Sequence, residues 1–251
     1  ATIRRPMLES FSSSTSGPCA TGNINVSSVL QGYQNCQYSI LKYPMNWPGV
    51  GDPYYTNEGG DRRLYYNVNA VPNVIVDGNF WQVNSNSLTS QIIDSSIAQL
   101  SFIDISSSYS VTGQTVDFQV TIDPFSNFSN LTLYAAIFEY QTFNNIGTNG
   151  ENQFYYVMKK MVPGSTGFSL PNLQTGVSVV ENFSYTFQGA YTLPPNANSP
   201  INHTIQHSIE DFSNLGVVTW IQDDVTKEIL QSKVSTNINS PAMSTDYVTS
   251  C

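Results

Sequence analysis

Charged residues are scarce in this sequence of 251 amino acids. Asp, Glu, Lys and Arg together make up 11%, against roughly 25% in an average globular protein. Basic residues are the scarcer kind, nine against eighteen acidic, which gives a net charge of −9. A nucleic-acid-binding protein needs clustered Lys and Arg to neutralise phosphates, whereas the basic pairs here are Arg4–Arg5, Arg62–Arg63 and Lys159–Lys160. The composition therefore excludes nucleic acid as a partner.

Long hydrophobic runs are also lacking. The longest apolar stretch of note, Leu133–Phe138, is far shorter than the ~20 residues needed to span a bilayer, so no transmembrane segment is expected. The chain begins with Ala and has no apolar leader near its start. We expect the mature form of an exported precursor. Neutral polar residues must cover most of the surface, which is more common outside cells than in the cytosol.

Cysteine occurs three times, as Cys19, Cys36 and Cys251. A Cys19–Cys36 disulfide is possible in an oxidising compartment. The intervening helix of some fifteen residues would, however, be about 22 Å long, whereas bridged Cα atoms lie within ~7 Å. Geometry therefore argues against this pair. Cys251 is either free, paired with one of the other two, or the start of a further segment.

The periodicity of the sequence predicts two domains. Hydrophobic residues make up 40% and aromatic residues 12%, enough to form sizeable cores. Residues 1–100 alternate between strand and helix patterns, which indicates an α/β domain. The expected strands are Pro6–Phe11, Gln37–Tyr43, Asn73–Val76 and Asn79–Val83, and the expected helices are Ala20–Asn35, Asp61–Asn67 and Ser87–Leu100.

After residue 100 the period of the apolar residues changes from 3.6 to 2. About seven strands separated by turn signals predict an antiparallel β-sandwich of immunoglobulin-like type over residues 101–236. Residues 237–251 are polar and are expected to form a tail. The expected fold class is α+β with two domains. The predicted strands lie at Ile103–Val111, Val116–Ile122, Leu131–Tyr140, Phe154–Met161, Val177–Phe187, Val217–Ile221 and Ile229–Val234.

The motif Ser16-Gly17-Pro18-Cys19 lies between a predicted strand and a predicted helix. Enzymes of the thioredoxin fold carry Cys-Gly-Pro-Cys at this place, and the motif here resembles theirs. In that chemistry a thiolate at a helix N-terminus attacks a disulfide, and the second cysteine resolves the mixed disulfide. Here Ser16 stands at the attacking position, and a hydroxyl cannot form a mixed disulfide. Only the resolving position, Cys19, keeps its sulfur.

Val71-Pro72, directly before a predicted strand, resembles the cis-proline loop that faces this motif in thioredoxins. Three further stretches are similar to thioredoxin-fold relatives of the twenty-eight-kilodalton outer-membrane protein family, which are often exported by the type IX secretion system. The resemblance implies a thioredoxin-like first domain and a place outside a bacterial cell or on its outer membrane. It implies no defined activity. The stretches are Tyr43–Tyr55 with Glu58–Arg63, Val157–Gly164 and Gln222–Gln231.

The loop Pro44–Gly60 is the candidate binding site. It follows a predicted parallel strand at the carboxyl end, the side where α/β sheets bind ligands, and it is rich in the aromatic and Arg residues typical of interaction hot spots. Alternatively, its rings only cover the domain. The candidate binding residues are Trp47, Asp52, Tyr54, Tyr55, Glu58, Arg62 and Arg63.

No metal site and no cofactor are predicted. Asp52, Glu58 and Asp61 lack the spacing of a calcium-binding loop. His203, His207 and Glu210 could ligate zinc on a helix, but no helix is expected inside a sandwich, so ordinary histidines are the better interpretation. Lys159–Lys160 reads most simply as a solvated strand end.

Two functional hypotheses follow. The first is a non-catalytic secreted or cell-surface protein that binds a protein partner or associates with itself through sheet edges. The second is a residual thiol-disulfide oxidoreductase or isomerase acting through Cys19, with a peptide-binding chaperone of the cell envelope as a further alternative.

Overall fold

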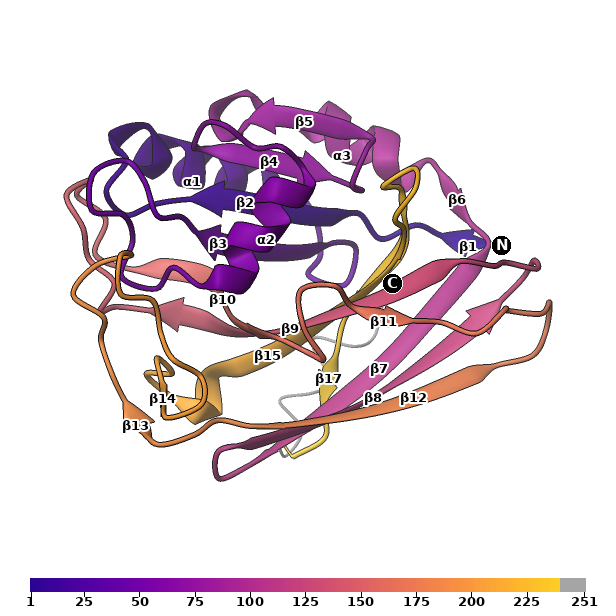
Figure 1. Cartoon of the computed structure of the whole chain (residues 1–251). Coiled ribbons are helices and arrows are strands. Elements are labelled where there is room, and N and C mark those ends of the chain that lie inside the picture. Colours follow the sequence, from indigo (N-terminus) through magenta and orange to yellow (C-terminus); the bar gives the residue numbers. More distant parts are fainter. Residues whose placement is uncertain (240–251) are drawn as a thin grey trace.

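The computed structural model describes residues 1–239 and has an α+β fold in which strands predominate (Figure 1). Three α-helices lie within these residues: α1 (Gly17–Leu30), α2 (Asn57–Tyr65) and α3 (Ser90–Ile97). None of them has the length and apolar character needed to cross a membrane. The main strands are β2 (Met7–Ser12), β3 (Ser39–Pro44), β4 (Asn73–Val76), β5 (Trp81–Asn84), β7 (Ile103–Thr112), β8 (Thr115–Pro124), β9 (Leu131–Thr142), β10 (Phe154–Met161), β12 (Val179–Thr186), β15 (Leu215–Asp223) and β16 (Ile229–Val234).

Short strands complete the sheets. They are β1 (Thr2–Ile3), β6 (Leu100–Ser101), β11 (Phe168–Ser169), β13 (Ala190–Tyr191), β14 (Gln206–His207) and β17 (Thr236–Asn237), and two 3-10 turns lie at Ser85–Ser87 and Phe212–Asn214. The predicted tail therefore begins inside β17, which pairs in parallel with β7. Residues 240–251 of that tail, including Cys251, lie outside the described residues.

One nine-stranded sheet runs through the molecule in the order β16-β15-β9-β10-β3-β2-β4-β5, with β11 beside β9. The β2-α1-β3 unit is parallel, and β4 and β5 are antiparallel to their neighbours. Strand β10 pairs in parallel with β3, with Val157 opposite Lys42. The sheet thus passes across the boundary that the sequence predicts near residue 100, and the two predicted domains share it.

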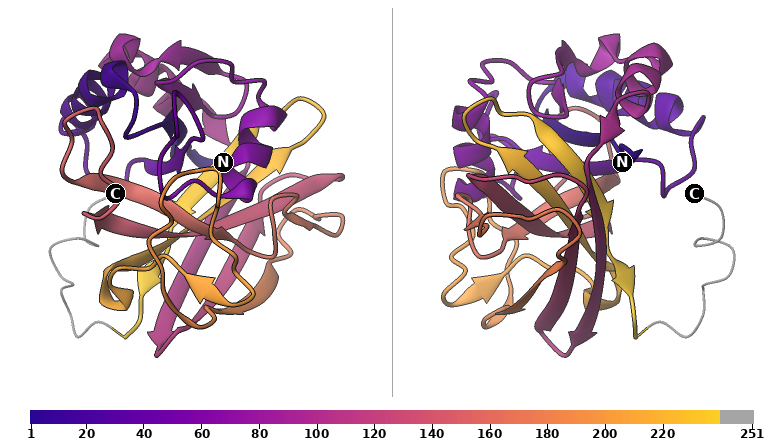
Figure 2. Two further views of the ribbon diagram at one scale, coloured as in Figure 1. Left: turned by 60° about the vertical axis from the view of Figure 1, so that its left-hand side comes forward. Right: turned by 90° about the vertical axis from the view of Figure 1, so that its right-hand side faces the viewer.

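Both faces of this sheet are covered, as the two views of Figure 2 show. On one face, α1 and α3 pack on β2, β3 and β4 around Val26, Ile40 and Ile93. On the opposite face lies a core to which both predicted domains contribute, with Tyr43 from β3 and Trp220 from β15. Because residues distant in sequence form one core, neither part buries its apolar side chains alone.

The second sheet has the order β12-β8-β7-β17 and stacks on the β9 and β15 end of the first. Apolar residues alternate along these strands and interdigitate between the sheets, with Val120 and Ile122 of β8 in contact with the cluster that contains Ile137 and Val217. The two sheets therefore pack face to face through the apolar sides of their strands. All seven predicted strands after residue 100 are present, with ends shifted by a few residues.

Helix α2 begins four residues before the predicted start at Asp61. Thr56 caps it, since its hydroxyl accepts a hydrogen bond from the Gly59 amide at 3.0 Å. Gly59 and Gly60 obscure this start because glycine disfavours helix interiors by about 1 kcal/mol. The structure needs small residues here: a Cβ on Gly60 would lie 2.3 Å from the hydroxyl oxygen of Tyr55. Tertiary packing outweighs helix propensity.

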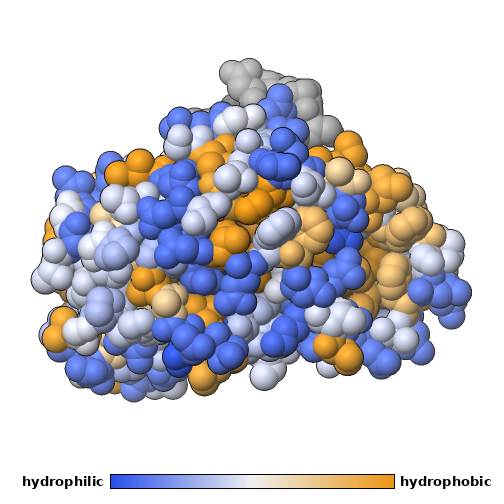
Figure 3. Space-filling view, turned by 90° about the horizontal axis from the view of Figure 1, so that it is seen from above, coloured by the Kyte–Doolittle hydropathy of each residue, from blue (hydrophilic) through white to orange (hydrophobic). Residues whose placement is uncertain are grey.

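Helices α1 and α3 also differ from the predicted ranges. Helix α1 begins at Gly17, with Ser16 as its N-cap and Pro18 in the first turn, where a missing N–H costs nothing. It ends at Leu30 instead of Asn35. Helix α3 spans Ser90–Ile97 instead of Ser87–Leu100. From the helical end, hydrophobic side chains are interspersed among hydrophilic ones (Figure 3).

Candidate functional site

The motif residues lie at the start of α1, as the sequence predicts. Ser16 is buried, and its carbonyl oxygen accepts a hydrogen bond from the Cys19 amide at 3.0 Å. The Cys19 thiol is free and fully buried, so the Cys19–Cys36 disulfide that the spacing disfavours does not form. The motif thus places an alcohol and one enclosed thiol where a redox pair would need two exchangeable sulfurs.

Burial raises the pKa of the Cys19 thiol above its usual value. Hydrogen bonds from the side chains of Ser16 and Ser12 act in the opposite direction, but desolvation is the larger effect. The thiol therefore stays protonated at neutral pH. A protonated, enclosed thiol is a poor nucleophile, because the thiolate is the attacking species in disulfide exchange.

Pro72 follows a cis peptide bond with Val71, as its resemblance to the cis-proline loop predicts. The residue is buried and packs against α1 at Gly22, where an added Cβ would lie 2.9 Å from the Pro72 ring. Gly22 is three residues from Cys19 along the same helix. The proline loop and the motif helix are therefore neighbours.

The predicted binding loop is anchored by Asp52, which is buried rather than presented to solvent. Its carboxylate accepts hydrogen bonds from the amides of Ser14 at 3.1 Å and Tyr54 at 2.9 Å, and from the Asn145 side chain. Burial raises the pKa of Asp52 to about 6. Asp52 therefore acts as an internal clamp that ties the loop to the segment before α1.

Tyr54 is also enclosed. Its hydroxyl donates to Glu210 at 2.6 Å, and the Lys159 ammonium lies 3.4 Å from the centre of its ring. Lys159 is buried and forms an ion pair with Glu139 at 3.1 Å. The interpretation of Lys159 as part of a solvated strand end is therefore wrong, because its charge is neutralised inside the molecule.

Arg62 and Glu58, two further predicted binding residues, are engaged by other parts of the chain. The Arg62 guanidinium is 1% exposed and donates two hydrogen bonds to Glu9, at 2.9 and 3.0 Å. Glu58 pairs with the Lys160 ammonium and accepts the amide of Met161 on β10. Burial raises the pKa of Glu58, against the opposing effect of the lysine. Both side chains stabilise the packing of α2.

The remaining predicted binding residues, Trp47, Tyr55 and Arg63, are partly exposed. The Arg63 guanidinium stacks 4.8 Å from the centre of the Trp47 ring and donates a hydrogen bond to the carbonyl of Val68. Glu58 is partly exposed as well, but its carboxylate is engaged by Lys160, so these three are the predicted residues that keep side-chain surface for a partner. A binding role for the loop stays a prediction that rests on them.

His203, His207 and Glu210 do not form a metal site. His207 lies on the short strand β14, and its ring nitrogens meet Gln114 at 2.9 Å and the amide of Ile209 at 3.2 Å. Glu210 receives the Tyr54 hydroxyl. Within residues 1–239 no group of three or more His, Cys, Asp and Glu side chains is arranged to hold a metal ion.

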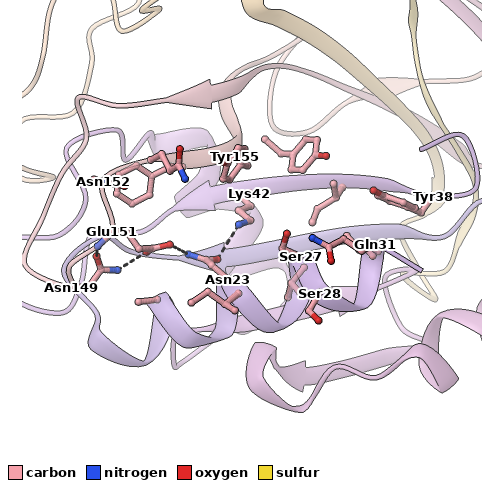
Figure 4. Close-up of a pocket in the computed structure, with 18 of the residues that line it drawn as sticks. Asn23, Ser27, Ser28, Gln31, Tyr38, Lys42, Asn149, Glu151, Asn152 and Tyr155 are labelled. Atoms are coloured by element: carbon pink, nitrogen blue, oxygen red, sulfur yellow. Dashed lines mark hydrogen bonds between the residues drawn. The ribbon is translucent and has the colours of Figure 1, made fainter. Parts of the chain in front are cut away.

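A cavity of about 940 Å³ lies beside α1 and was not predicted from the sequence. Its walls are α1 and the segment 149–156, and its lining includes Ile40 and Lys42 of β3 and Tyr38 directly before that strand (Figure 4). Ser12 connects it to the motif, since its side chain bonds both Cys19 and Asn23. No local pattern marks these residues, because segment 149–156 is brought to α1 only by the pairing of β10 with β3.

No protein-family model matches the sequence, and no curated protein matches it. Solved structures do share its fold. An Agrobacterium tumefaciens protein, a structural-genomics target, has 13% identity and a TM-score of 0.60 over 96% of this chain and 98% of its own. HBP35 of Porphyromonas gingivalis has 10% identity and a TM-score of 0.65 over 96% of this chain and 79% of its own. At these identities the similarity establishes the fold alone.

A domain of the outer membrane lipoprotein Omp28 from Porphyromonas gingivalis also matches, over 55% of this chain with 14% identity and a TM-score of 0.32.

Proposed function

We propose that this chain works by contact rather than by catalysis, as an interaction protein of the bacterial cell envelope. On this proposal it is exported as a precursor and acts outside the cell or on the outer-membrane surface, with a protein or a second copy of itself as partner. The thioredoxin-like nature of the first half and the immunoglobulin-like nature of the sandwich are part of the same proposal.

One observation carries it: the motif at the start of α1 holds a buried serine and a buried, protonated thiol. Disulfide exchange requires an accessible thiolate and a second sulfur to release the mixed disulfide. Ser16 cannot supply the first, and Cys19 is enclosed. Without its nucleophile, a scaffold of this shape can still present surfaces for binding, but it cannot carry out disulfide exchange.

The composition supports the place of action. Neutral polar residues dominate, charge is low and basic clusters are absent, so the surface offers little electrostatic repulsion against association. Trp47 and Arg63 form a partly exposed stacked pair of the residue types enriched at interaction hot spots.

Insulin reduction by dithiothreitol tests the catalytic half of the proposal. Wild-type protein should not accelerate the reaction above the rate without protein. The variant Ser16→Cys, which restores a second sulfur, should gain activity if the scaffold is thioredoxin-like. Wild-type activity that disappears in Cys19→Ser would overturn the proposal in favour of a residual oxidoreductase.

Sedimentation of purified protein and protease digestion of intact host cells test the contact half. We expect association with itself or with an envelope partner, reduced by replacing Trp47 with serine, and digestion of the protein from outside the cell. A stable monomer that is protected inside intact cells would refute this half.

A further inference from the structure

The cavity beside α1 has the size of a ligand site and a polarised lining. Its volume of about 940 Å³ falls within the roughly 300–1,000 Å³ usual for small-molecule sites. In Figure 4 Lys42, Asn23 and Glu151 lie toward one end, whereas Gln31 and Tyr38 lie toward the other. A ligand with one charged end and one neutral end fits this arrangement.

Lys42 is the cation of the lining. Its ammonium donates a hydrogen bond to Asn23 Oδ1 at 3.0 Å and makes no other hydrogen bond within residues 1–239. An ammonium has three N–H donors, so two remain for another group. The five ion pairs formed in the described part of the chain do not include Lys42.

Glu151 acts on the Lys42 charge from a distance, raising its pKa, but it forms no hydrogen bond to the ammonium because its oxygens accept from other groups. Oε1 accepts the Asn23 amide at 2.8 Å, and Oε2 accepts the Asn149 amide at 2.6 Å. The first of these bonds fixes the side-chain amide of Asn23 with its oxygen toward Lys42. Glu151 therefore orients the neighbour of the lysine and leaves two ammonium donors unused.

Lys159 provides an internal comparison. Lys159 is fully buried, and a carboxylate oxygen of Glu139 lies 3.1 Å from its ammonium. Lys42 is partly buried and, among the residues that the structure describes, has no carboxylate at that distance. A charge removed from water is costly unless it is paired, and desolvation lowers the pKa of Lys42 to about 8 despite the opposing effect of Glu151. An external anion would supply to Lys42 what Glu139 supplies to Lys159.

The wall opposite α1 carries backbone strain. Tyr156 has φ of 57°, in the left-handed region that bulky residues rarely occupy. Backbone strain of this kind is concentrated at ligand and active sites. The adjacent Tyr155 is 40% exposed and Ile24, across the cavity on α1, is 69% exposed. The cavity is therefore reachable from solvent and has an aromatic and aliphatic rim.

We propose that this cavity binds a carboxylate-bearing ligand, whose carboxylate accepts hydrogen bonds from the Lys42 ammonium and whose neutral body lies along α1 toward Gln31 and Tyr38. The carboxylate belongs either to a free small acid or to the C-terminus of a peptide. The proposal goes beyond the envelope function above and does not depend on thiol chemistry or on cellular location.

Matched pairs of probes test it on the full chain by NMR titration. Benzoate is compared with benzamide, and the peptide Ala-Ala-Tyr with its C-terminal amide, all at constant ionic strength. We expect at least one carboxylate to shift resonances of Asn23 and Gln31, and its amide to bind about tenfold more weakly or worse, as loss of a charge-assisted bond implies. Binding of benzoate but not of Ala-Ala-Tyr indicates a free small acid as the ligand. Binding of Ala-Ala-Tyr but not of benzoate indicates the C-terminus of a peptide.

Two variants test whether binding occurs in this cavity. Lys42→Met keeps the length and apolar stem of the side chain and should abolish binding, whereas Lys233→Met, at a partly buried lysine outside the cavity, should leave it unchanged. Should Lys42→Met fail to fold, Ile24→Trp gives the same answer, because it alters an exposed position at the rim and should block entry.

Three results would each overturn the proposal. The first is equal binding of carboxylate and amide, and the second is unchanged binding in Lys42→Met or Ile24→Trp. The third is no binding of either carboxylate at millimolar concentration to the folded wild-type protein.

Discussion

The ion pair between Arg62 and Glu9 should be a principal stabilising contact of this protein. Both side chains are almost completely buried. The guanidinium also donates to the Tyr66 hydroxyl and the Gln222 side chain, at 2.9 and 3.0 Å, and lies 4.5 Å from the centre of the Tyr134 ring. Because Glu9 and Arg62 come from the first hundred residues and Gln222 and Tyr134 from the rest, the pair joins the two parts.

The expected loss of unfolding free energy depends on which buried charge each variant leaves without its partner. Arg62→Met removes the cation but leaves the Glu9 carboxylate enclosed in a core, and breaking a buried pair in this way costs about 3–5 kcal/mol. For a chain of this size such a loss corresponds to a fall in melting temperature of roughly 6–20 °C. Glu9→Gln should cost a similar amount, and the double variant less than the sum, because neither charge is then left alone.

Urea unfolding followed by tryptophan fluorescence gives the free energies. Arg63→Met is the matched control: it is the next residue on α2, is partly exposed and bonds one carbonyl, so its loss should cost less than about 1 kcal/mol. If Arg62→Met were no less stable than Arg63→Met, the buried pair would not stabilise the fold and the reasoning would be refuted.

Three further predictions concern other parts of the molecule. Burial raises the pKa of Asp52 from 3.8 to about 6, so this group adds stability below about pH 4 that is lost as the pH rises through about 6. Relative to Asp52→Asn, the wild type should therefore lose ~3 kcal/mol of unfolding free energy between these values, and parallel pH curves for the two proteins would contradict this. Gly78→Ala should destabilise the protein far more than Gly113→Ala, because a Cβ at Gly78 would lie 1.7 Å from the Lys227 carbonyl oxygen, whereas one at Gly113 meets open space. Both glycines have positive φ, and the backbone strain that alanine adds at either position costs about 1–2 kcal/mol. Equal midpoints of thermal unfolding for the two variants would refute the clash at Gly78. Cys19 should be alkylated by iodoacetamide only after unfolding, as read from fragment-ion mass spectra, and labelling of the native protein at the unfolded rate would show that the thiol is accessible.

Local signals in the sequence identify most elements of the fold. The alternation Val116, Phe118, Val120 and Ile122 marks β8 because one side of that strand faces the core of the sandwich. The β-branched run of β4 is found with its exact ends, Asn73–Val76. These signals are carried by residues adjacent in the chain, so they survive without knowledge of the fold.

No local signal in the sequence shows that the two predicted domains share one sheet. Strand β10 has the same alternation whether it ends a separate sandwich or continues a sheet into β3, so the register of Val157 with Lys42 cannot be read from either segment. The same limit applies to Arg62 and Asp52. Their residue types suggested recognition, whereas the partners that bury them, such as Glu9 and Asn145, are distant in sequence.

The cavity shows this limit most clearly. Lys42 reads as a polar residue in a strand, and Asn23 as a polar residue in a helix. Their neighbour Glu151 comes from a loop more than a hundred positions away, and only the pairing of β10 with β3 in the shared sheet brings it near. The Ser16–Cys19 motif and the proline loop could be found because a known family supplied the pattern.

The position of β10 and β15 in the shared sheet also governs how the polypeptide can mature. A nascent chain that emerges amino end first presents β2, α1 and β3 well before the strands that cover Phe11 and Tyr43 exist. Those rings, and the Glu9 and Arg62 charges between them, remain uncovered until Trp220 and Gln222 arrive. A partly synthesised chain therefore cannot complete this shared core, and the Glu9 and Arg62 charges obtain their full set of partners only when the last strands are made.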